Sequence, residues 1–378
     1  MTPSPEARRR LDIGILIALL PPEHLGGAEL QAERLARELA ARGHRVRVYC
    51  RAQPGRPPHE ERAGVRISRR PVLPFPGLRL IAELWLGARQ VRREPPEILL
   101  CFMTMNSGLI GALASAWCGI PFIVWQRSEG ESMVRVRALE RWLARRINRR
   151  ARALWLQAEV CARTLEREYQ RLGRAPEWRS LQSRVRVLGN GVDVPLAHAE
   201  PVPPWRVLFV GRLDPLKDLP TLIEAARRVP ECEVWIAGTG ALRAALEEQA
   251  RGTTIRFLGE QPHERIPELL AAARALVLCS VQEGVPNVVL EALAHGRPVI
   301  ATPVGAIPEL VRDGVHGRLV PVGDVERLAA ALREVGDDAQ WRDWAAQARD
   351  AVARFDWPRL VRQVEEELGA LLDAPEAR

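Results

Sequence analysis

The sequence predicts an α/β protein of two doubly wound parallel-sheet domains, and three features indicate this class. Short apolar runs of strand length alternate with amphipathic helical stretches, which is typical of β-α-β units. The 378 residues suit two domains of about 150 to 200 residues. A 47% hydrophobic content is enough for two buried cores. We expect a first domain of 1–195, a second of 196–352 that follows a proline-rich linker, and a carboxyl-terminal helix in 353–378.

The first domain is predicted to open with a strand, a helix and a second strand. The apolar run 11–20 ends at Pro21, so we expect a buried strand there and no signal peptide. Residues 29–43 form an amphipathic helix and 44–50 the second strand. Before the helix stand Gly26 and Gly27, where the backbone can approach a ligand closely or simply turn.

The next segment is predicted to leave the core. Residues 51–70 are polar and rich in proline and arginine, so we expect a surface loop leading into a short strand near Val65–Ser68. Residues 69–93 then place apolar and aromatic side chains among six arginines: Phe75, Leu78, Leu80, Ile81, Leu84, Trp85 and Leu86. Two interpretations stay open, a membrane-surface patch or a core-facing helix with a solvated basic side.

The rest of the first domain combines an uncharged stretch with a strongly basic one. Residues 98–126 carry no charge but are broken by polar and glycine-proline positions, which predicts strand, helix and strand within a sheet. Arg127 and Glu129 follow, where they could bind an acceptor or a sugar, or pair with each other. We expect residues 134–171 to be helical, with a basic face that is solvated or lies against anionic lipid.

The second domain is predicted to begin with a strand, a charged loop and a helix in residues 206–229. Arg212 and Lys217 bracket the loop at the carboxyl end of the strand. Of 55 basic residues Lys217 is the only lysine, which indicates either a need for a compact, movable charge or a stray surface residue. Two cations there can neutralise a departing diphosphate. The later Gly238 and Gly240 are a weak phosphate signal and are predicted to form a tight turn.

Residues 275–302 form the stretch around which the second domain is arranged. An unbroken apolar run, ALVLCS, predicts a buried parallel strand, and the following helical spacing ends at Gly296. Between them we expect a turn through Pro286, with Asn287 as the helix cap. The cap would leave three backbone amides facing anionic oxygens at the carboxyl edge of the sheet, those of Val288, Val289 and Leu290.

Two carboxylates flank these amides, Glu283 in the loop and Glu291 one turn into the helix. Carboxylates beside an anion site are poor phosphate ligands but good acceptors for sugar hydroxyls. The combination indicates a ligand that carries both phosphates and polyols, such as a nucleotide sugar.

Several motifs together resemble those of the family 4 retaining glycosyltransferases. EGVPNVVLE resembles the family's E-x7-E signature, GRLDPLKD its diphosphate motif, and NGVD its hinge after the last strand of the first domain. The resemblance implies the GT-B fold, with two Rossmann-like domains facing a cleft and a final helix that crosses back to the first domain. It further implies that Gly26 and Gly27 lie across that cleft from the nucleotide diphosphate, and that residues 258–261 line the base pocket beside a surface His263.

The resemblance also implies roles for individual residues. Arg212 and Lys217 would stabilise the departing diphosphate, Glu283 would hold sugar hydroxyls and Glu291 the ribose. The family's histidine near the transferred sugar has no counterpart, and Arg127 is the nearest candidate. We expect a hexosyltransferase that retains anomeric configuration by front-face displacement, with a UDP- or GDP-sugar as donor. No cofactor is expected, and no metal site either, because no Asp-x-Asp-type triplet stands near the site.

Charge and cysteine usage bear on partners and compartment. Residues 1–195 carry a net charge of +15 and residues 196–378 one of −7, so the first half favours an anionic lipid surface or a lipid-linked acceptor glycan. Nucleic acid is not expected, since no binding motif is present and only two tyrosines and six phenylalanines are available for stacking. The six cysteines lack metal-ligand spacing and predict reduced core residues in a cytoplasmic protein. The basic first half favours peripheral docking of that protein on the inner face of the plasma membrane.

Two other functions fit parts of the pattern. A nucleotide-sugar epimerase can share the two-domain architecture but would turn over donor without an acceptor. A non-catalytic membrane-surface binding protein would account for the basic half but not for the residues gathered at the carboxyl edge of the second sheet.

Overall fold

The structure is a computed structural model, and the residues that it describes are 9–21, 26–72, 79–127, 138–195 and 205–374. The chain divides into two compact units: unit 1 is Met1–Gly189 with Pro358–Arg378, and unit 2 is Asn190–Trp357. The divisions differ from the predicted boundaries at 195 and 352. Val192 accounts for the difference, because its amide donates to the Phe355 carbonyl (2.9 Å) and its carbonyl accepts from the Trp357 amide (3.2 Å).

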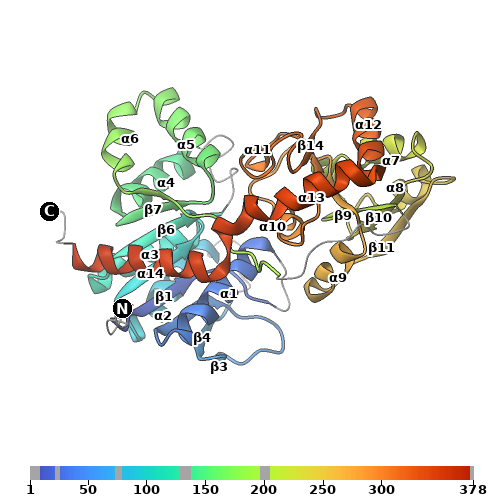
Figure 1. Cartoon of the computed structure of the whole chain (residues 1–378). Helices are drawn as coiled ribbons and strands as arrows, with labels where there is room; N and C mark the ends of the chain where they lie inside the picture. Colours follow the sequence, from blue (N-terminus) through green and yellow to red (C-terminus); the bar gives the residue numbers. More distant parts are fainter. Residues whose placement is uncertain (1–8, 22–25, 73–78, 128–137, 196–204, 375–378) are drawn as a thin grey trace, which may run out of the picture. The chain divides into compact units, whose positions relative to one another are not determined.

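Within its described residues, unit 1 contains an eight-stranded sheet flanked by helices (Figure 1). Its strands are β1 Asp12–Leu16, β2 Arg45–Arg51, β3 His59–Arg62, β4 Val65–Arg70, β5 Ile98–Phe102, β6 Phe122–Gln126, β7 Ala153–Leu156 and β8 Val185–Val187. Its helices are α1 Gly27–Ala41, α2 Arg79–Arg93, α3 Ser107–Cys118, α4 Ala138–Arg150, α5 Glu159–Arg171, α6 Ala175–Gln182 and α14 Trp357–Asp373. The strand order is β3-β4-β2-β1-β5-β6-β7-β8, and β3 alone among them runs antiparallel.

The uncharged stretch 98–126 is the strand, helix and strand that its breaks predict, and β5 and β6 are buried along their whole length. Two other predictions were wrong. The segment 51–70 contains an additional strand, β3, with the sequence HEER. This sequence has no apolar face and can still form a strand, because β3 lies at the sheet edge and pairs with β4 alone among the described strands. Residues 134–171 are not helical throughout, since the buried strand β7 interrupts them with only four apolar residues.

Helix α14 packs on unit 1 at the edge where the parallel strands begin. The carboxylate of Glu365 lies 2.9 Å from Arg42 Nη1 and 3.0 Å from His44 Nε2. The other ring nitrogen of His44 accepts a hydrogen bond from the Leu11 amide just before β1. This chain of contacts joins the last helix to the first strands, so residues more than 300 positions apart in sequence stabilise the same edge.

Unit 2 contains a six-stranded sheet, wholly parallel among its described strands, in the order β11-β10-β9-β12-β13-β14. The strands are β9 Arg206–Val210, β10 Glu233–Ala237, β11 Ile255–Gly259, β12 Ala275–Leu278, β13 Val299–Ala301 and β14 Gly317–Leu319. The helices are α7 Leu219–Arg227, α8 Arg243–Gln249, α9 Ile266–Ala271, α10 Asn287–Ala294, α11 Ile307–Leu310, α12 Val325–Gly336 and α13 Asp338–Val352, with the 3-10 turns η3 Pro215–Lys217, η4 His263–Arg265 and η5 Ala353–Phe355.

The order of strands in unit 2 determines where its functional residues can meet. Strand β9 lies between β10 and β12, so the loops that follow β9, β10 and β12 emerge side by side at the carboxyl edge of the sheet. Helix α10 ends at Ala294, and Gly296 adopts a φ of 66°, as the predicted helix stop requires.

The cysteines match their prediction, since all six are free thiols and five of them are buried. Burial raises the pKa of the Cys50 thiol to about 11 and that of Cys232 to about 12. In the described part of the chain, no helix has both the length and the apolar character needed to cross a bilayer.

Candidate functional site

The loop after β9, which carries Arg212 and Lys217, is held in place by the neighbouring loop after β10. Leu213 donates its amide to the Thr239 carbonyl (2.9 Å), and Leu242 donates to the Leu213 carbonyl (3.2 Å). The two backbones approach so closely that a Cβ at Gly238 would lie 1.9 Å from the Gly211 carbonyl oxygen. Gly238 and Gly240 therefore serve a backbone approach, in agreement with the tight turn predicted there.

The structure brings Lys217 and Glu283 into direct contact. Lys217 Nζ lies 2.5 Å from Glu283 Oε1, and the Ser280 hydroxyl donates to the same oxygen at 2.6 Å. A backbone bond from the Val281 amide to the Leu216 carbonyl (2.9 Å) holds the two loops together. Both partners are largely buried, with 17% of the Lys217 side chain and 10% of the Glu283 side chain exposed.

The other carboxylate oxygen of Glu283, Oε2, accepts no hydrogen bond from any residue in the described ranges of the chain. An ammonium has three N–H donors, and Glu283 takes one of those of Lys217. The pair therefore keeps an acceptor for a hydroxyl and further donors for an anion, side by side.

A third loop, the one that follows β13, packs against the loop that carries Glu283. Gly305 adopts a φ of 57°, and a Cβ there would lie 2.3 Å from the Glu283 carbonyl oxygen. The Ala306 amide donates to the Gly284 carbonyl at 2.9 Å. The loop that carries Glu283 thus rests on a backbone surface that only glycine leaves open.

The start of α10 differs in detail from the prediction. Pro286 occupies the cap position and Asn287 is the first helical residue, so the expected side-chain cap at Asn287 was wrong. Its Oδ1 instead accepts a hydrogen bond from Asn190 Nδ2 at 2.5 Å, which takes the side chain away from the helix amides. The amide of Val289, predicted to be free, donates to the Pro286 carbonyl at 3.1 Å. Val288, half-buried, keeps its predicted place in the first turn.

Glu291 lies in α10, where burial raises the pKa of its carboxyl group, nearby His263 opposes that rise and Asp193 adds to it. Spacing along the chain gave no sign that these three residues meet. His263 is exposed on η4, as predicted for a surface residue at a helix start. The expected base-pocket segment precedes it, where the Gln261 side chain donates to the Leu258 carbonyl at 2.7 Å.

Arg212 stands apart from the buried pair. Its side chain is 79% exposed, and its Nη2 lies 3.2 Å from Asp214 Oδ2. The same carboxylate group accepts the Leu216 amide through Oδ1 (3.0 Å) and so caps η3. Arg212 shares the loop of Lys217, and its long side chain is not fixed in the interior.

Sequence reasoning missed two supporting residues in this site. Ser280 is fully buried and orients Glu283, but a serine at the end of a strand carries no distinctive pattern. Asn190 was predicted only as a turn residue, and its contact with Asn287 joins segments nearly a hundred residues apart. Among the residues that the structure describes, no group of three or more His, Cys, Asp or Glu side chains could hold a metal ion.

The candidate residues of unit 1 lie on separate elements. Gly26 is the cap of α1 with an extended backbone, and Gly27 is the first residue of that helix. Arg127 follows β6 and is buried, with its guanidinium carbon 4.9 Å from the ring centre of Trp125 and 5.2 Å from that of Phe102. Arg127 thus packs on two aromatic rings, and Glu129 lies outside the described residues.

Two family models match the chain and together span most of it. The model described as "Glycosyl transferase 4-like domain" matches residues 26–191, and the one described as "Glycosyl transferases group 1" matches residues 204–338.

Individual glycosyltransferase relatives and solved structures are also similar to this chain. A phosphatidyl-myo-inositol mannosyltransferase of Mycolicibacterium smegmatis is 34% identical over 210 residues, which is 51% of this chain and 54% of that protein, so the chain spans about half its length. A sucrose-phosphate synthase structure from Thermosynechococcus elongatus has a TM-score of 0.82 at 22% identity, over 97% of this chain and all of that one. Anabaena HepE in complex with UDP-glucose has a TM-score of 0.76 at 21% identity, over 96% of this chain and all of that one. These likenesses confirm the predicted fold class.

Gly305→Ala should destabilise the protein by about 3 kcal/mol, because the left-handed backbone costs about 1 kcal/mol and the clash with the Glu283 carbonyl adds a similar or larger amount. Gly323→Ala is the matched control, since Gly323 has a φ of 75° but no atom within 4 Å of its Cβ position. Urea unfolding measures both, and an equal loss in the two variants would contradict the support that Gly305 gives to the Glu283 loop.

Glu291→Gln should raise the stability of the ligand-free protein at neutral pH. With its pKa raised by burial, the folded carboxyl opposes ionisation, so the charged form costs stability above the ordinary glutamate pKa. That cost disappears at lower pH, where the carboxyl is protonated in both states. Urea midpoints at about pH 7.5 and about pH 4.5 should therefore show a clear gain at the higher pH and a much smaller one at the lower pH, where roughly half of the unfolded carboxyl groups are protonated. Glu268→Gln, at a side chain 74% exposed, should show no gain at either pH.

Proposed function

Because the chain belongs to the family 4 glycosyltransferases, we propose that it transfers a sugar from a nucleotide-diphosphate sugar to an acceptor, with retention of anomeric configuration and without a metal ion. The contact between Lys217 Nζ and Glu283 Oε1 carries the proposal. It joins the segment that resembles the family's diphosphate motif to the segment that resembles its sugar motif. A cation and a hydroxyl acceptor in contact are what a sugar diphosphate requires.

The diphosphate is the leaving group, and its negative charge grows as the glycosidic bond breaks. Lys217 supplies a positive charge held in place by Glu283, and Arg212 supplies a second from the same loop. The exposed side chain of Arg212 can turn from Asp214 toward the phosphates, because that ion pair is at the surface and weak. The first turn of α10, with Pro286, Asn287, Val288 and Val289, adds the positive end of a helix.

The sugar and the ribose would be held by the two carboxylates. Glu283 Oε2 is placed to accept a sugar hydroxyl while Oε1 stays on Lys217 and Ser280. Glu291 would accept hydrogen bonds from the ribose hydroxyls. These bonds would take the place of the hydrogen bonds to water that burial removes from its carboxylate. No side chain is assigned as a nucleophile, so we propose a front-face displacement in which the leaving diphosphate assists the incoming acceptor.

A UDP- or GDP-sugar is the proposed donor, and the crystal structure of HepE with UDP-glucose supports a uridine nucleotide. On the acceptor side we propose a lipid-linked or cell-envelope glycan. The mannosyltransferase relative carries a phosphatidyl-inositol lipid in its name, and unit 1 supplies the surface described next.

Helices α2 and α3 present an apolar and basic surface, which we call the α2–α3 patch: Leu80, Ile81, Trp85, Arg89, Arg92, Arg93 and Trp117. Ile81 is 67% exposed, Trp85 47% and Trp117 42%. The Arg89 guanidinium lies 5.1 Å from the centre of the Trp85 ring. Aromatic rings flanked by arginines are suited to a bilayer interface with anionic headgroups.

The other side of α2 packs on the core through Ala88 and Val91, so one helix has an apolar face in each direction. A core-facing helix with a purely basic outer side does not account for exposed Ile81 and Trp85. We therefore propose that the enzyme docks on the inner face of the plasma membrane through unit 1. Phe75 and Leu78, predicted for the same surface, lie outside the described residues.

One class among UDP-, GDP- and ADP-sugars should raise the melting temperature of the wild type, with most of the shift lost in Glu291→Ala. With that donor and an acceptor extract, Lys217→Gln should lower kcat by about 10²- to 10³-fold, since it removes a charge on the leaving group. Arg251→Gln, at a side chain 77% exposed, is the control and should keep full activity.

No stabilisation by any donor would contradict the proposal. Turnover of donor without an acceptor, yielding an epimerised nucleotide sugar, would identify an epimerase instead. Product anomers of inverted configuration, read by NMR, would refute retention.

The wild type should sediment with vesicles that contain about 30% phosphatidylglycerol and not with pure phosphatidylcholine. The double variant Ile81→Ser/Trp85→Ser should bind them at least about tenfold more weakly, because each side chain loses apolar burial. Val322→Ser removes an exposed β-branched side chain from unit 2 and is the control. Equal binding by the double variant and the wild type would remove the α2–α3 patch from the proposal.

A further inference from the structure

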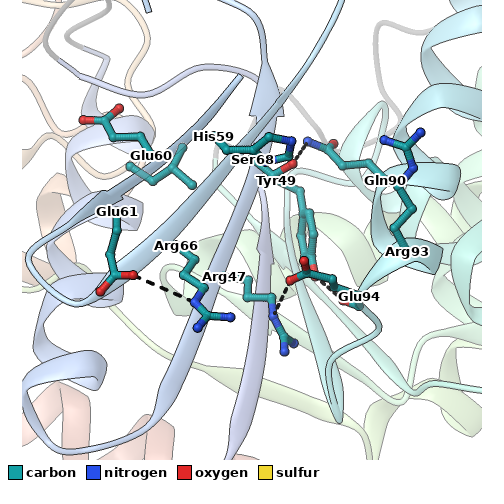
Figure 2. Close-up of a pocket in the computed structure, with 11 residues that line it drawn as sticks. Arg47, Tyr49, His59, Glu60, Glu61, Arg66, Ser68, Gln90, Arg93 and Glu94 are labelled. Carbon is teal, nitrogen blue, oxygen red and sulfur yellow. Dashed lines mark hydrogen bonds and ion pairs between the residues drawn. The ribbon is translucent and has the colours of Figure 1, made fainter. Parts of the chain in front are cut away.

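Unit 1 contains a cavity of about 540 Å³ that the proposed reaction does not use (Figure 2). It lies over the middle of strands β2, β4 and β3 and is bounded by the last turns of α2. Among the described candidate residues of unit 1, Gly26 and Gly27 stand at the start of α1 and Arg127 follows β6, so this cavity is separate from them. Its size falls within the range of small-ligand sites, about 300 to 1,000 Å³.

The floor of the cavity consists of two rows of side chains set by strand register. His59, Ser68 and Tyr49 stand opposite one another across β3, β4 and β2. Glu61, Arg66 and Arg47 form the second row, one pleat away. Each row therefore places hydrogen-bonding groups along one face of the sheet. The Tyr49 ring also lines the cavity.

The wall of the cavity is fixed to the floor. Gln90 Nε2 donates to the Ser68 hydroxyl at 2.9 Å, and the Tyr49 hydroxyl donates to the Glu94 carbonyl at 2.7 Å. Figure 2 shows Gln90 of α2, and Glu94 just after that helix, directed toward the strand residues. Helix and sheet are thus held at a set separation, which makes the cavity a formed site with no need to open.

Charged groups in the cavity are balanced in sign and weakly paired. Arg66 Nε lies 3.9 Å from Glu61 Oε2, with both side chains more than 60% exposed, and Arg47 Nε lies 3.5 Å from Glu94 Oε2. Arg93 forms no ion pair with any carboxylate in the described parts of the chain. Arg47 is only 10% exposed and Asp12 holds it at 2.6 Å, so it belongs to the sheet. The exposed pair of Arg66 and Glu61 contributes little to stability, so its donors and acceptor, like those of Arg93 and Glu94, are available to a ligand.

From this lining we infer that the cavity is a carbohydrate-binding site, separate from the donor site. Guanidinium donors and carboxylate acceptors that lie close together over one face of the sheet match the vicinal hydroxyls of a sugar, each of which both donates and accepts. An anion would meet the carboxylates of Glu61 and Glu94, and an apolar ligand would leave these polar groups unsatisfied. A neutral oligosaccharide of one to three rings fits the charge balance and the volume.

The inference is tested with neutral trisaccharides of glucose, mannose, galactose and N-acetylglucosamine, titrated up to about 10 mM by saturation-transfer NMR and calorimetry. At least one should bind the wild type. Arg66→Met removes a donor and Glu94→Gln removes a charged acceptor, so each should weaken binding about tenfold. Both side chains are more than 60% exposed, which protects the fold, and Arg251→Met is the control, expected to bind as the wild type does.

Binding that Glu94→Gln strengthens and Arg66→Met weakens would identify an anion site, and inorganic phosphate would then compete. That result would overturn the inference, as would no binding by any trisaccharide or binding unchanged in both variants. Thermal shift with UDP- and GDP-sugars in the same samples keeps the two proposals apart. Donor binding without trisaccharide binding removes only the cavity site, and the reverse removes only the transferase.

Discussion

The close approach of backbone to backbone at three glycines is the constraint on which the site of unit 2 depends. Gly238 and Gly240 let the loop after β10 touch the loop after β9, and Gly305 lets a third loop touch the carbonyl of Glu283. These contacts hold the loops so that the side chains of Lys217 and Glu283 are in direct contact. Because backbone contacts within the protein hold the pair in place, little ordering is left for substrate binding to supply, which is the advantage of a preorganised site.

The two glutamates of the site are placed in different environments. Glu283 is held by a cation and a hydroxyl, whereas the pKa of Glu291 is raised by burial. Two carboxyl groups in different surroundings can bind different parts of one ligand. Glu283 is fixed in place by its ion pair, and Glu291 can accept ligand hydroxyls in place of the water that burial removes. The same helix, α10, carries Glu291 and borders the loop of Glu283, so a ligand that touches both also touches its amino end.

Unit 1 shows that net charge overstates the charge available to a partner. Arg69 is buried against Glu60 at 2.7 Å, and Arg47 is held by Asp12 at 2.6 Å, so these arginines serve the sheet. Arg127 packs on aromatic rings. Arg89, Arg92 and Arg93 of α2, by contrast, are exposed on the helix that carries exposed Ile81 and Trp85. The distribution of exposed charge, and not its sum, distinguishes a docking surface from a salt-bridged sheet edge.

The sequence by itself determined the α/β class and the strand–helix–strand character of 98–126, because burial periodicity is a local property. It also placed Lys217 and Glu283 at the same carboxyl edge of the second sheet, because both follow predicted parallel strands. It could not determine β3 or β7, since a charged edge strand and a four-residue strand lack a periodic signal. Only the tertiary structure decided that Asn287 bonds to Asn190, that His263 and Asp193 reach Glu291 and that a cavity lies over β2, β4 and β3. Each of these depends on segments distant in sequence whose distances no local pattern encodes.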